Sequence, residues 1–124
     1  MASLDLDENT AKYQIRAYRA GCIQVNDKML TNSIIVSPDV LIEDWMPQSV
    51  DELTALSFEV ILPHKPDILL IGTGSTHVFL TVEIYGELIN QGIGVEIMDT
   101  SAACRTYNAL SAEGRNVIAA LLIA

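Results

Sequence analysis

The sequence predicts an α/β protein in which a C-terminal β-α-β-α-β unit is accompanied by an N-terminal β-rich meander. Residues 67–124 alternate short apolar runs with amphipathic stretches, and uninterrupted apolar runs are typical of strands buried on both faces of a parallel sheet. Residues 13–45 instead show short alternating segments separated by turn residues, as in a meander that is apolar on one face. We expect residues 1–124 to form a single domain, with residues 1–12 loose.

Length and composition limit the class of protein. At 124 residues, half of them hydrophobic, the chain is long enough to bury a core without disulfides or metals. Its net charge of −9 would repel nucleic acids and anionic membranes. No apolar run approaches the ~20 residues of a membrane span, and the N-terminus lacks the features of a signal peptide or a mitochondrial presequence. Because its two cysteines form no Cys-x-x-Cys pair, we expect a soluble, acidic, cytoplasmic protein.

The N-terminal and middle parts of the chain contain weaker signals. Asn26-Asp27 predicts a hairpin turn in the meander, because Asn and Asp tolerate the left-handed conformation. Ser49–Glu52 has the Ser-x-x-Glu spacing of a helix capping box. Residues 56–62 predict a short helix that ends before Pro63, whose ring is excluded from a helix interior. The helical spacing rests on three apolar residues, Leu56, Val60 and Ile61.

The C-terminal unit is predicted in more detail. Thr81 and Asp99 precede its two helices as candidate N-caps, and Gly92 and Gly114 follow them as C-terminal glycines. Parallel strands joined by such helices are connected by right-handed crossovers. The expected elements are strand 67–71, helix 82–90, strand 95–98, helix 100–112 and strand 117–123.

The same unit carries a family resemblance. Gly72-Thr-Gly74 after an apolar strand, followed by the run Gly92–Arg115 (GIGVEIMDTSAACRTYNALSAEGR), resembles the Mth-domain family of conserved hypothetical proteins. Relatives in that family include a mitochondrial complex I assembly factor and an adipogenesis-associated Mth-domain protein. The resemblance extends from about Tyr13 to Leu122. It implies a three-layer fold with a mixed central sheet and an additional β layer, and it implies no activity and no catalytic residues.

One candidate ligand site follows from the expected topology. Ligands of open α/β sheets bind beyond the carboxyl ends of parallel strands, so the residues after strands 67–71 and 95–98 could share a crevice. Backbone amides at the start of the second helix would attract a small anion there. The candidate binding residues are Gly72, Thr73, Gly74, His77, Asp99, Thr100, Ser101, Cys104, Arg105 and Asn108.

The strand-end residues also have structural interpretations. Gly72-x-Gly74 lacks the third glycine of a dinucleotide-binding fingerprint, because His77 stands in its place, and it also fits a tight strand-exit turn. Asp99 fits a helix cap as well as an acid-base group. Both interpretations of each residue remain open at the level of sequence.

Cys104 and Arg105 likewise allow two interpretations each. The thiol is either a thiolate favoured by Arg105 and the helix N-terminus, with His77 as the available base, or a buried structural cysteine. The guanidinium either binds a ligand or forms an ion pair. The carboxylates considered for that pair are Glu96, Asp99 and Glu113.

The sequence offers no convincing Ser-His-Asp order, paired catalytic carboxylates, phosphate-binding loop or metal-ligand spacing. It therefore favours a non-catalytic interaction or assembly-type protein that needs no cofactor and no metal. Its partner would be another protein or a second copy in a homodimer. The alternative is a protein or enzyme that binds a small anionic ligand in the crevice at Gly72–Gly74, His77, Asp99 and Arg105.

Overall fold

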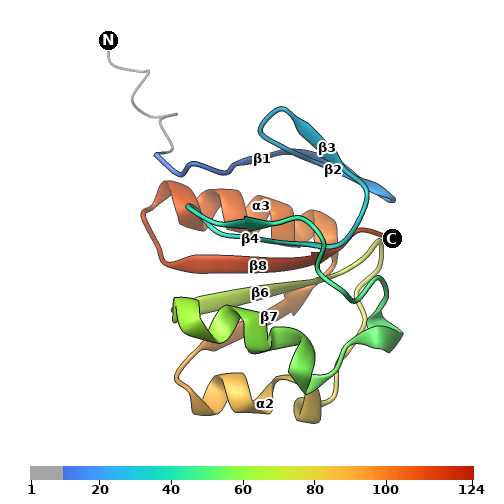
Figure 1. Ribbon diagram of the computed structural model, residues 1–124, viewed down its shortest axis with the longest axis vertical. Helices are drawn as coiled ribbons and strands as arrows, with labels where there is room; N and C mark the ends of the chain where they lie inside the picture. Colours follow the sequence, from blue (N-terminus) through green and yellow to red (C-terminus); the bar gives the residue numbers. More distant parts are fainter. Residues whose placement is uncertain (1–9) are drawn as a thin grey trace.

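The structure is a computed structural model that describes residues 10–124 as strands and helices arranged in layers (Figure 1). The N-terminal elements are β1 (Ile15–Arg19), β2 (Cys22–Val25), β3 (Lys28–Leu30), β4 (Ile34–Val36) and β5 (Leu41–Ile42). Two 3-10 helices follow, η1 (Val50–Glu52) and η2 (Ala55–His64). The last elements are β6 (Ile68–Thr73), α2 (Val82–Asn90), β7 (Gly94–Met98), α3 (Thr100–Ala112) and β8 (Val117–Leu122).

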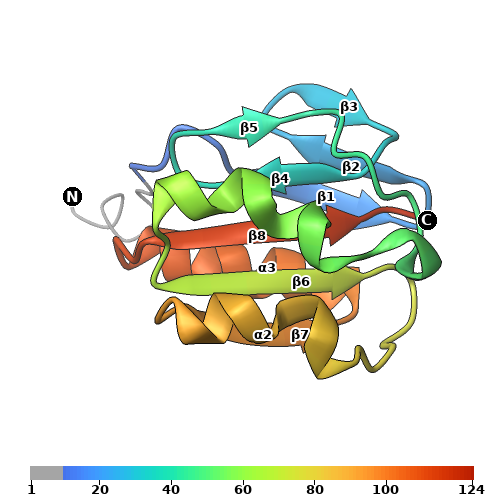
Figure 2. The same cartoon turned by 60° about the horizontal axis from the view of Figure 1, so that its bottom comes forward.

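These strands form two sheets. β1, β2 and β3 form an antiparallel three-stranded sheet, and the others form a five-stranded sheet in the order β5-β4-β8-β6-β7. β6 is parallel to both of its neighbours, β7 and β8, whereas β4 is antiparallel to β8 and β5. Figure 2 shows α2 and η2 over one face of the five-stranded sheet and α3 on the other. The predicted α/β fold, with a mixed central sheet and an additional β layer, is confirmed.

Successive residues of β8 face two different cores, one on each side of the central sheet. One core joins the sheet to α3 and to the small sheet through Tyr107 and Ile23, and the other joins it to η2 and α2 through Phe58 and Leu88. Because both faces of β8 are buried, its apolar run has no polar alternation. Its residues in the first core are Val117, Ala119 and Leu121, and those in the second are Ile118, Ala120 and Leu122.

The N-terminal meander is divided between the two sheets. β1 to β3 form the outer layer, and Asn26 adopts the left-handed conformation (φ 53) at the predicted hairpin turn. β4 pairs instead with β8, where Ile34 lies opposite Leu121. Ile34 and Ile35 contribute to opposite cores, so β4 is buried on both faces. The expected meander is apolar on one face only, whereas β4 is buried on both. β4 is therefore a strand of the central sheet and not of the outer layer.

The helix predicted at residues 56–62 forms as the 3-10 helix η2, and its expected end before Pro63 is wrong. The helix includes Pro63 and ends at His64, and the C-cap residue Lys65 is left-handed (φ 47). The φ of proline, about −65°, lies within the range of a 3-10 helix. With three residues per turn, η2 buries Phe58 and Ile61, which are three positions apart.

The expected capping box at Ser49–Glu52 is also wrong. Ser49 precedes η1, but its side chain makes no capping hydrogen bond. The Glu52 carboxylate instead accepts a hydrogen bond from the Gln48 N–H at 2.9 Å. A reciprocal capping box forms further along the chain, between Thr54 and Ser57 at the start of η2.

The predicted C-terminal elements are confirmed within one or two residues at each end. Asp99 caps α3 through its carboxylate, whereas Thr81 occupies the N-cap position of α2 without a side-chain hydrogen bond. Gly92 and Gly114 follow the two helices with positive φ angles of 88° and 77°. Within residues 10–124, no helix has the length and apolar character needed to cross a membrane.

The prediction for residues 1–12 falls mostly outside the residues that the structure describes, because residues 1–9 are not among them. Of the remaining three, Lys12 is held to the molecule by its N–H, which donates to the Pro38 carbonyl at 2.7 Å. That residues 1–12 are loose therefore stays a prediction.

Candidate functional site

The start of α3 lies against the carboxyl ends of β6 and β8, where the topology predicted a ligand site. Thr100 is fully buried, and its Oγ1 accepts a hydrogen bond from the Gly74 N–H at 2.8 Å and donates to the Leu122 carbonyl at 2.6 Å. The Thr100 N–H in turn donates to the Gly74 carbonyl at 2.9 Å. These three bonds join the two strand ends to the helix, so the hydroxyl of Thr100 is committed to the fold.

Gly72 and Gly74 allow this close approach. A Cβ atom on Gly72 would lie 2.8 Å from Thr100 Oγ1 and 3.0 Å from a methyl group of Leu121. Gly74 has a φ of +102°, and a Cβ atom there would lie 2.7 Å from the Ala124 carbonyl oxygen. The two glycines therefore serve the packing around Thr100, and protein atoms fill the space between them and α3.

The loop after β6 contains two further candidates with different surroundings. Thr73 Oγ1 donates to the Thr76 carbonyl at 2.6 Å and accepts from the Val78 N–H at 3.2 Å, so Thr73 shapes the loop. His77 is exposed, and its ring packs edge-to-face on Phe79 with centroids 4.6 Å apart. The imidazole is thus held at the surface, apart from the buried contact between Gly74 and Thr100.

Asp99 occupies the position that an anionic ligand would need. Its Oδ1 accepts a hydrogen bond from the Ala102 N–H at 2.9 Å, as an N-cap residue does. The carboxylate also interacts favourably with the positive end of the helix dipole. An anion approaching the amides of α3 would therefore meet a negative charge already bound there.

Three further candidates on α3, Ser101, Arg105 and Asn108, have different surroundings. Arg105 Nη1 donates to Ser101 Oγ at 2.8 Å, and both side chains are exposed. Asn108 instead faces β1, where its Oδ1 accepts from the Ile15 N–H at 3.1 Å and its Nδ2 donates to the Ile15 carbonyl at 2.7 Å. The Asn108 amide thus forms the same pair of hydrogen bonds with the backbone of Ile15 that a neighbouring strand would form. Among the described residues, no ion pair joins Arg105 to Glu96, Asp99 or Glu113.

Cys104 lies buried in the core shared by α3 and the small sheet. Burial raises the pKa of its thiol to about 12, the Asp99 charge adds to this effect, and Arg105 opposes it. Burial also raises the pKa of the nearby Tyr18, and the negative charges of Cys104 and Asp99 raise it further. At neutral pH the Cys104 thiol is therefore protonated, in keeping with the structural interpretation of this residue.

The carboxyl ends of β6 and β8 also border a small cavity of about 250 Å³. Among the described residues of its wall, Thr73 is the one candidate, and the wall includes Asp51 but no Lys, Arg or His. The cavity therefore offers no positive side chain to an anion. Within residues 10–124, no three His, Cys, Asp or Glu side chains are placed to hold a metal ion. Ligand binding by the ten candidate residues stays a prediction.

A different, apolar groove of about 540 Å³ lies between the segment after β5 and the helix η2. We call it the Trp45 groove, after the buried indole in its wall, whose Nε1 donates to the Ser57 carbonyl at 2.9 Å. Met46, Leu56 and Val60 border it with 84%, 72% and 41% of their surface exposed. Its apolar lining residues are Ile42, Trp45, Met46, Pro47, Leu56 and Val60.

The sequence did not reveal this groove, because its pattern grouped Leu56 and Val60 with Ile61 at helical spacing. In a 3-10 helix the buried positions recur every three residues, which selects Phe58 and Ile61 and turns Leu56 and Val60 outward. The available signal was the three-residue spacing of Phe58 and Ile61 before a proline.

A protein-family model and several known proteins match most of the chain. A family model described as "Protein of unknown function (DUF498/DUF598)" matches residues 15–122. A zebrafish (Danio rerio) protein named NADH dehydrogenase (ubiquinone) 1 alpha subcomplex assembly factor 3 is 32% identical, over 93% of this chain and 67% of that protein. A Francisella tularensis protein named 13 kDa major membrane protein is 28% identical, over 94% of this chain and 96% of that protein.

Solved structures share the fold. The crystal structure of a Bordetella parapertussis protein is 38% identical in sequence, with a TM-score of 0.86, over 94% of this chain and all of that one. The solution structure of a Bordetella pertussis protein, described as a Mth938-like domain, is 33% identical, with a TM-score of 0.80 over 94% of this chain and 89% of that one. The expected resemblance is thereby confirmed, and the chain belongs to the DUF498/DUF598 family of Mth938-like α/β proteins.

Proposed function

We propose that this protein is a non-catalytic, assembly-type protein that binds another protein through the Trp45 groove. The observation that carries the proposal is the exposure of Met46, Leu56 and Val60 around a single apolar groove. Single exposed apolar side chains are ordinary on protein surfaces, whereas several around one concave site indicate a binding surface. Methionine suits such a surface, because its flexible thioether adapts to different partners.

Two further observations support an assembly role. The zebrafish relative is named as an assembly factor of NADH dehydrogenase. In the predicted ligand site, Thr100, Thr73 and Asp99 bond to the protein itself. The proposal therefore places the working surface at the Trp45 groove rather than at the start of α3.

The proposal includes the cytoplasmic location expected from the sequence. Both cysteines are free thiols, which supports a reducing compartment. Fractionation of the native cell followed by immunodetection tests this part, and we expect the protein in the cytoplasmic fraction. Recovery with the membranes after a high-salt wash would contradict it.

Affinity purification of the tagged full chain from its native cell tests the binding role. We expect a partner protein in stoichiometric amount, and we expect Met46→Gln together with Leu56→Ser to remove it. Both side chains are mostly exposed, so these changes leave the cores intact. Met29→Gln is the matched control, because Met29 is also exposed but lies on β3 in the other sheet. Recovery of the bare chain, or a partner that the groove variant retains, would contradict the proposal.

A further inference from the structure

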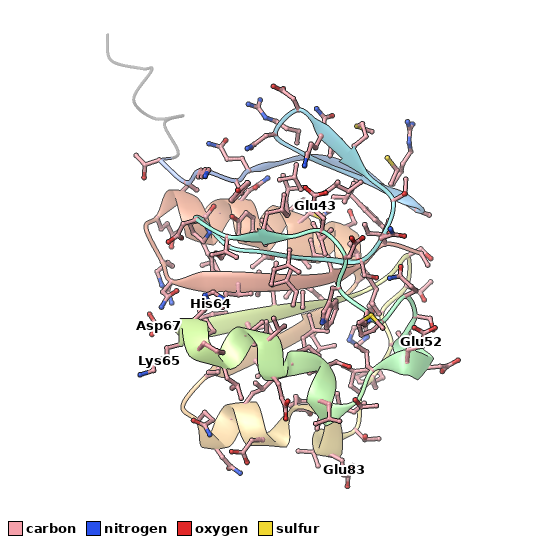
Figure 3. All side chains as sticks on the ribbon, in the orientation of Figure 1. Glu43, Glu52, His64, Lys65, Asp67 and Glu83 are labelled. Atoms are coloured by element: carbon pink, nitrogen blue, oxygen red, sulfur yellow. The ribbon has the colours of Figure 1, made fainter. Side chains whose placement is uncertain are left out.

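Among the described residues, the charged side chains that line the Trp45 groove are all acidic. Residues 43–62 contain the carboxylates Glu43, Asp44, Asp51, Glu52 and Glu59 and no Lys, Arg or His. Asp44 and Glu52 lie in the groove wall itself, and Figure 3 shows Glu52 on the η1 turn. An apolar floor with an acidic rim is complementary to an apolar surface edged by positive side chains.

Most of this charge is uncompensated within the molecule. Glu43 forms an ion pair with Lys28. Among the described residues, no ion pair involves Asp44, Asp51, Glu52 or Glu59, although Asp44 accepts a 3.4 Å hydrogen bond from Asn32 and Glu52 accepts one from the Gln48 N–H. The rim therefore retains a charge that a partner can neutralise.

Two other kinds of occupant fit the groove less well. An extended peptide gains its affinity from hydrogen bonds to an exposed strand, and β5, the strand that leads into the groove, is only two residues long. An anionic membrane surface would be repelled by the acidic rim and by the net charge of −9. A helix brings its apolar stripe to a groove while its own backbone hydrogen bonds remain internal.

We propose that the occupant of the Trp45 groove is an amphipathic helix of a partner protein, with Lys or Arg residues on both sides of its apolar face. This inference rests on the proposed function and adds the chemistry of the partner segment. Apolar side chains of the helix would contact Met46, Leu56 and Val60, and its basic side chains would face Asp44 and Glu52. The carboxylates would act mainly by speeding association and selecting basic partners.

The structure provides its own reporter for this interaction. The single tryptophan of the chain is Trp45, which lies in the groove wall with its ring 5.5 Å from that of Phe58. We would titrate the full chain with a Trp-free synthetic helix of about 18 residues, with Leu at helical spacing and Lys beside it. One comparison peptide has Glu in place of Lys, and another has the same composition without an apolar face. Trp45 emission is recorded at several salt concentrations.

We expect the Lys peptide to change Trp45 emission with a saturable curve and to bind more weakly as salt increases. Asp44→Asn and Glu52→Gln should each weaken it by about 2- to 5-fold, the effect of one exposed ion pair. Glu83→Gln is the matched control, because Glu83 is an exposed carboxylate at the start of α2, apart from Glu52 in Figure 3. Both comparison peptides should bind more weakly than the Lys peptide.

The outcomes separate this inference from the proposed function. Equal binding of the Lys and Glu peptides, with loss of binding in Met46→Gln, would overturn the basic partner and leave the apolar groove intact. If the affinity of the Lys peptide is unchanged in both the Met46 and the carboxylate variants, or if no peptide binds, the helical occupant is overturned. The proposed function would still stand in that case if a native partner is captured and is lost in Met46→Gln together with Leu56→Ser.

Discussion

The Thr100 hydroxyl accepts a hydrogen bond from the Gly74 N–H at 2.8 Å and donates one to the Leu122 carbonyl at 2.6 Å. One side chain thereby joins β6, β8 and α3 at the point where the topology predicted a ligand. Gly72, Gly74 and Thr100 suggested a ligand site in the sequence, but in the structure they pack against one another and fill this end of the sheet.

Thr100→Val tests this junction. Valine keeps the shape of the side chain but leaves the Gly74 N–H and the Leu122 carbonyl without this partner, so we expect a loss of about 2–4 kcal/mol in the free energy of unfolding. Urea denaturation measures it. Thr100→Ser keeps the hydroxyl and should cost clearly less. Equal losses in the two variants would show that the methyl group rather than the hydroxyl matters.

Gly72→Ala tests the close approach of β6 to α3. The added Cβ atom would lie 2.8 Å from Thr100 Oγ1, so we expect destabilisation of about 1–3 kcal/mol by overpacking. Gly86→Ala in α2 is the matched control. Its Cβ atom would meet Val82 at an ordinary 3.5 Å, and the higher helix propensity of alanine should stabilise α2 by about 0.5–1 kcal/mol. Thermal unfolding that moves in the same direction for both would contradict the packing argument.

Asn108→Ala tests the attachment of the small sheet to α3. It removes both hydrogen bonds to the Ile15 backbone, and we expect about 1–3 kcal/mol of destabilisation. Amide hydrogen exchange should show the loss first at Ile15, because β1 can then separate locally from α3. Uniform acceleration across the central sheet would instead indicate global destabilisation without a specific role in holding β1.

Cys104 contributes to the fall in folding stability at alkaline pH. Its pKa rises from 9.0 in the unfolded chain to about 12 in the folded one, so between these values the unfolded state binds fewer protons than the folded state. Stability must therefore fall as pH rises above 9, by about 1.4 kcal/mol at pH 10. Cys104→Ala should lose this component, so that its stability relative to the parent improves between pH 8 and pH 10. Parallel curves over that interval would show that Cys104 does not contribute.

Arg105→Ala separates the two functional hypotheses. Arg105 is exposed and bonds to Ser101, so its removal should change the free energy of unfolding by less than about 0.5 kcal/mol. We also expect inorganic phosphate and small carboxylates to leave the melting temperature of the parent protein unchanged. A stabilisation by phosphate that is lost in Arg105→Ala would establish the anionic-ligand site in place of the assembly role.

The regular elements of the C-terminal half were predictable because their determinants are local. Asp99 precedes an amphipathic run and caps it, and Gly114 ends it, whatever the rest of the chain does. The helix at residues 56–62 was harder to predict. Its helical character was recognised, but whether three or 3.6 residues form a turn is decided by which side chains the sheet can bury.

The α/β class, the order of strands and helices in the second half, and the family could all be read from the amino-acid sequence. That β4 joins the central sheet, that Thr100 fills the expected crevice and that Leu56 and Val60 face solvent became visible only in the folded molecule. The two sets of features depend on interactions of different range along the chain. Caps, turns and periodicity act over a few neighbouring residues, whereas the pairing of Ile34 with Leu121 and the bond from Gly74 to Thr100 join parts of the chain that no local pattern connects.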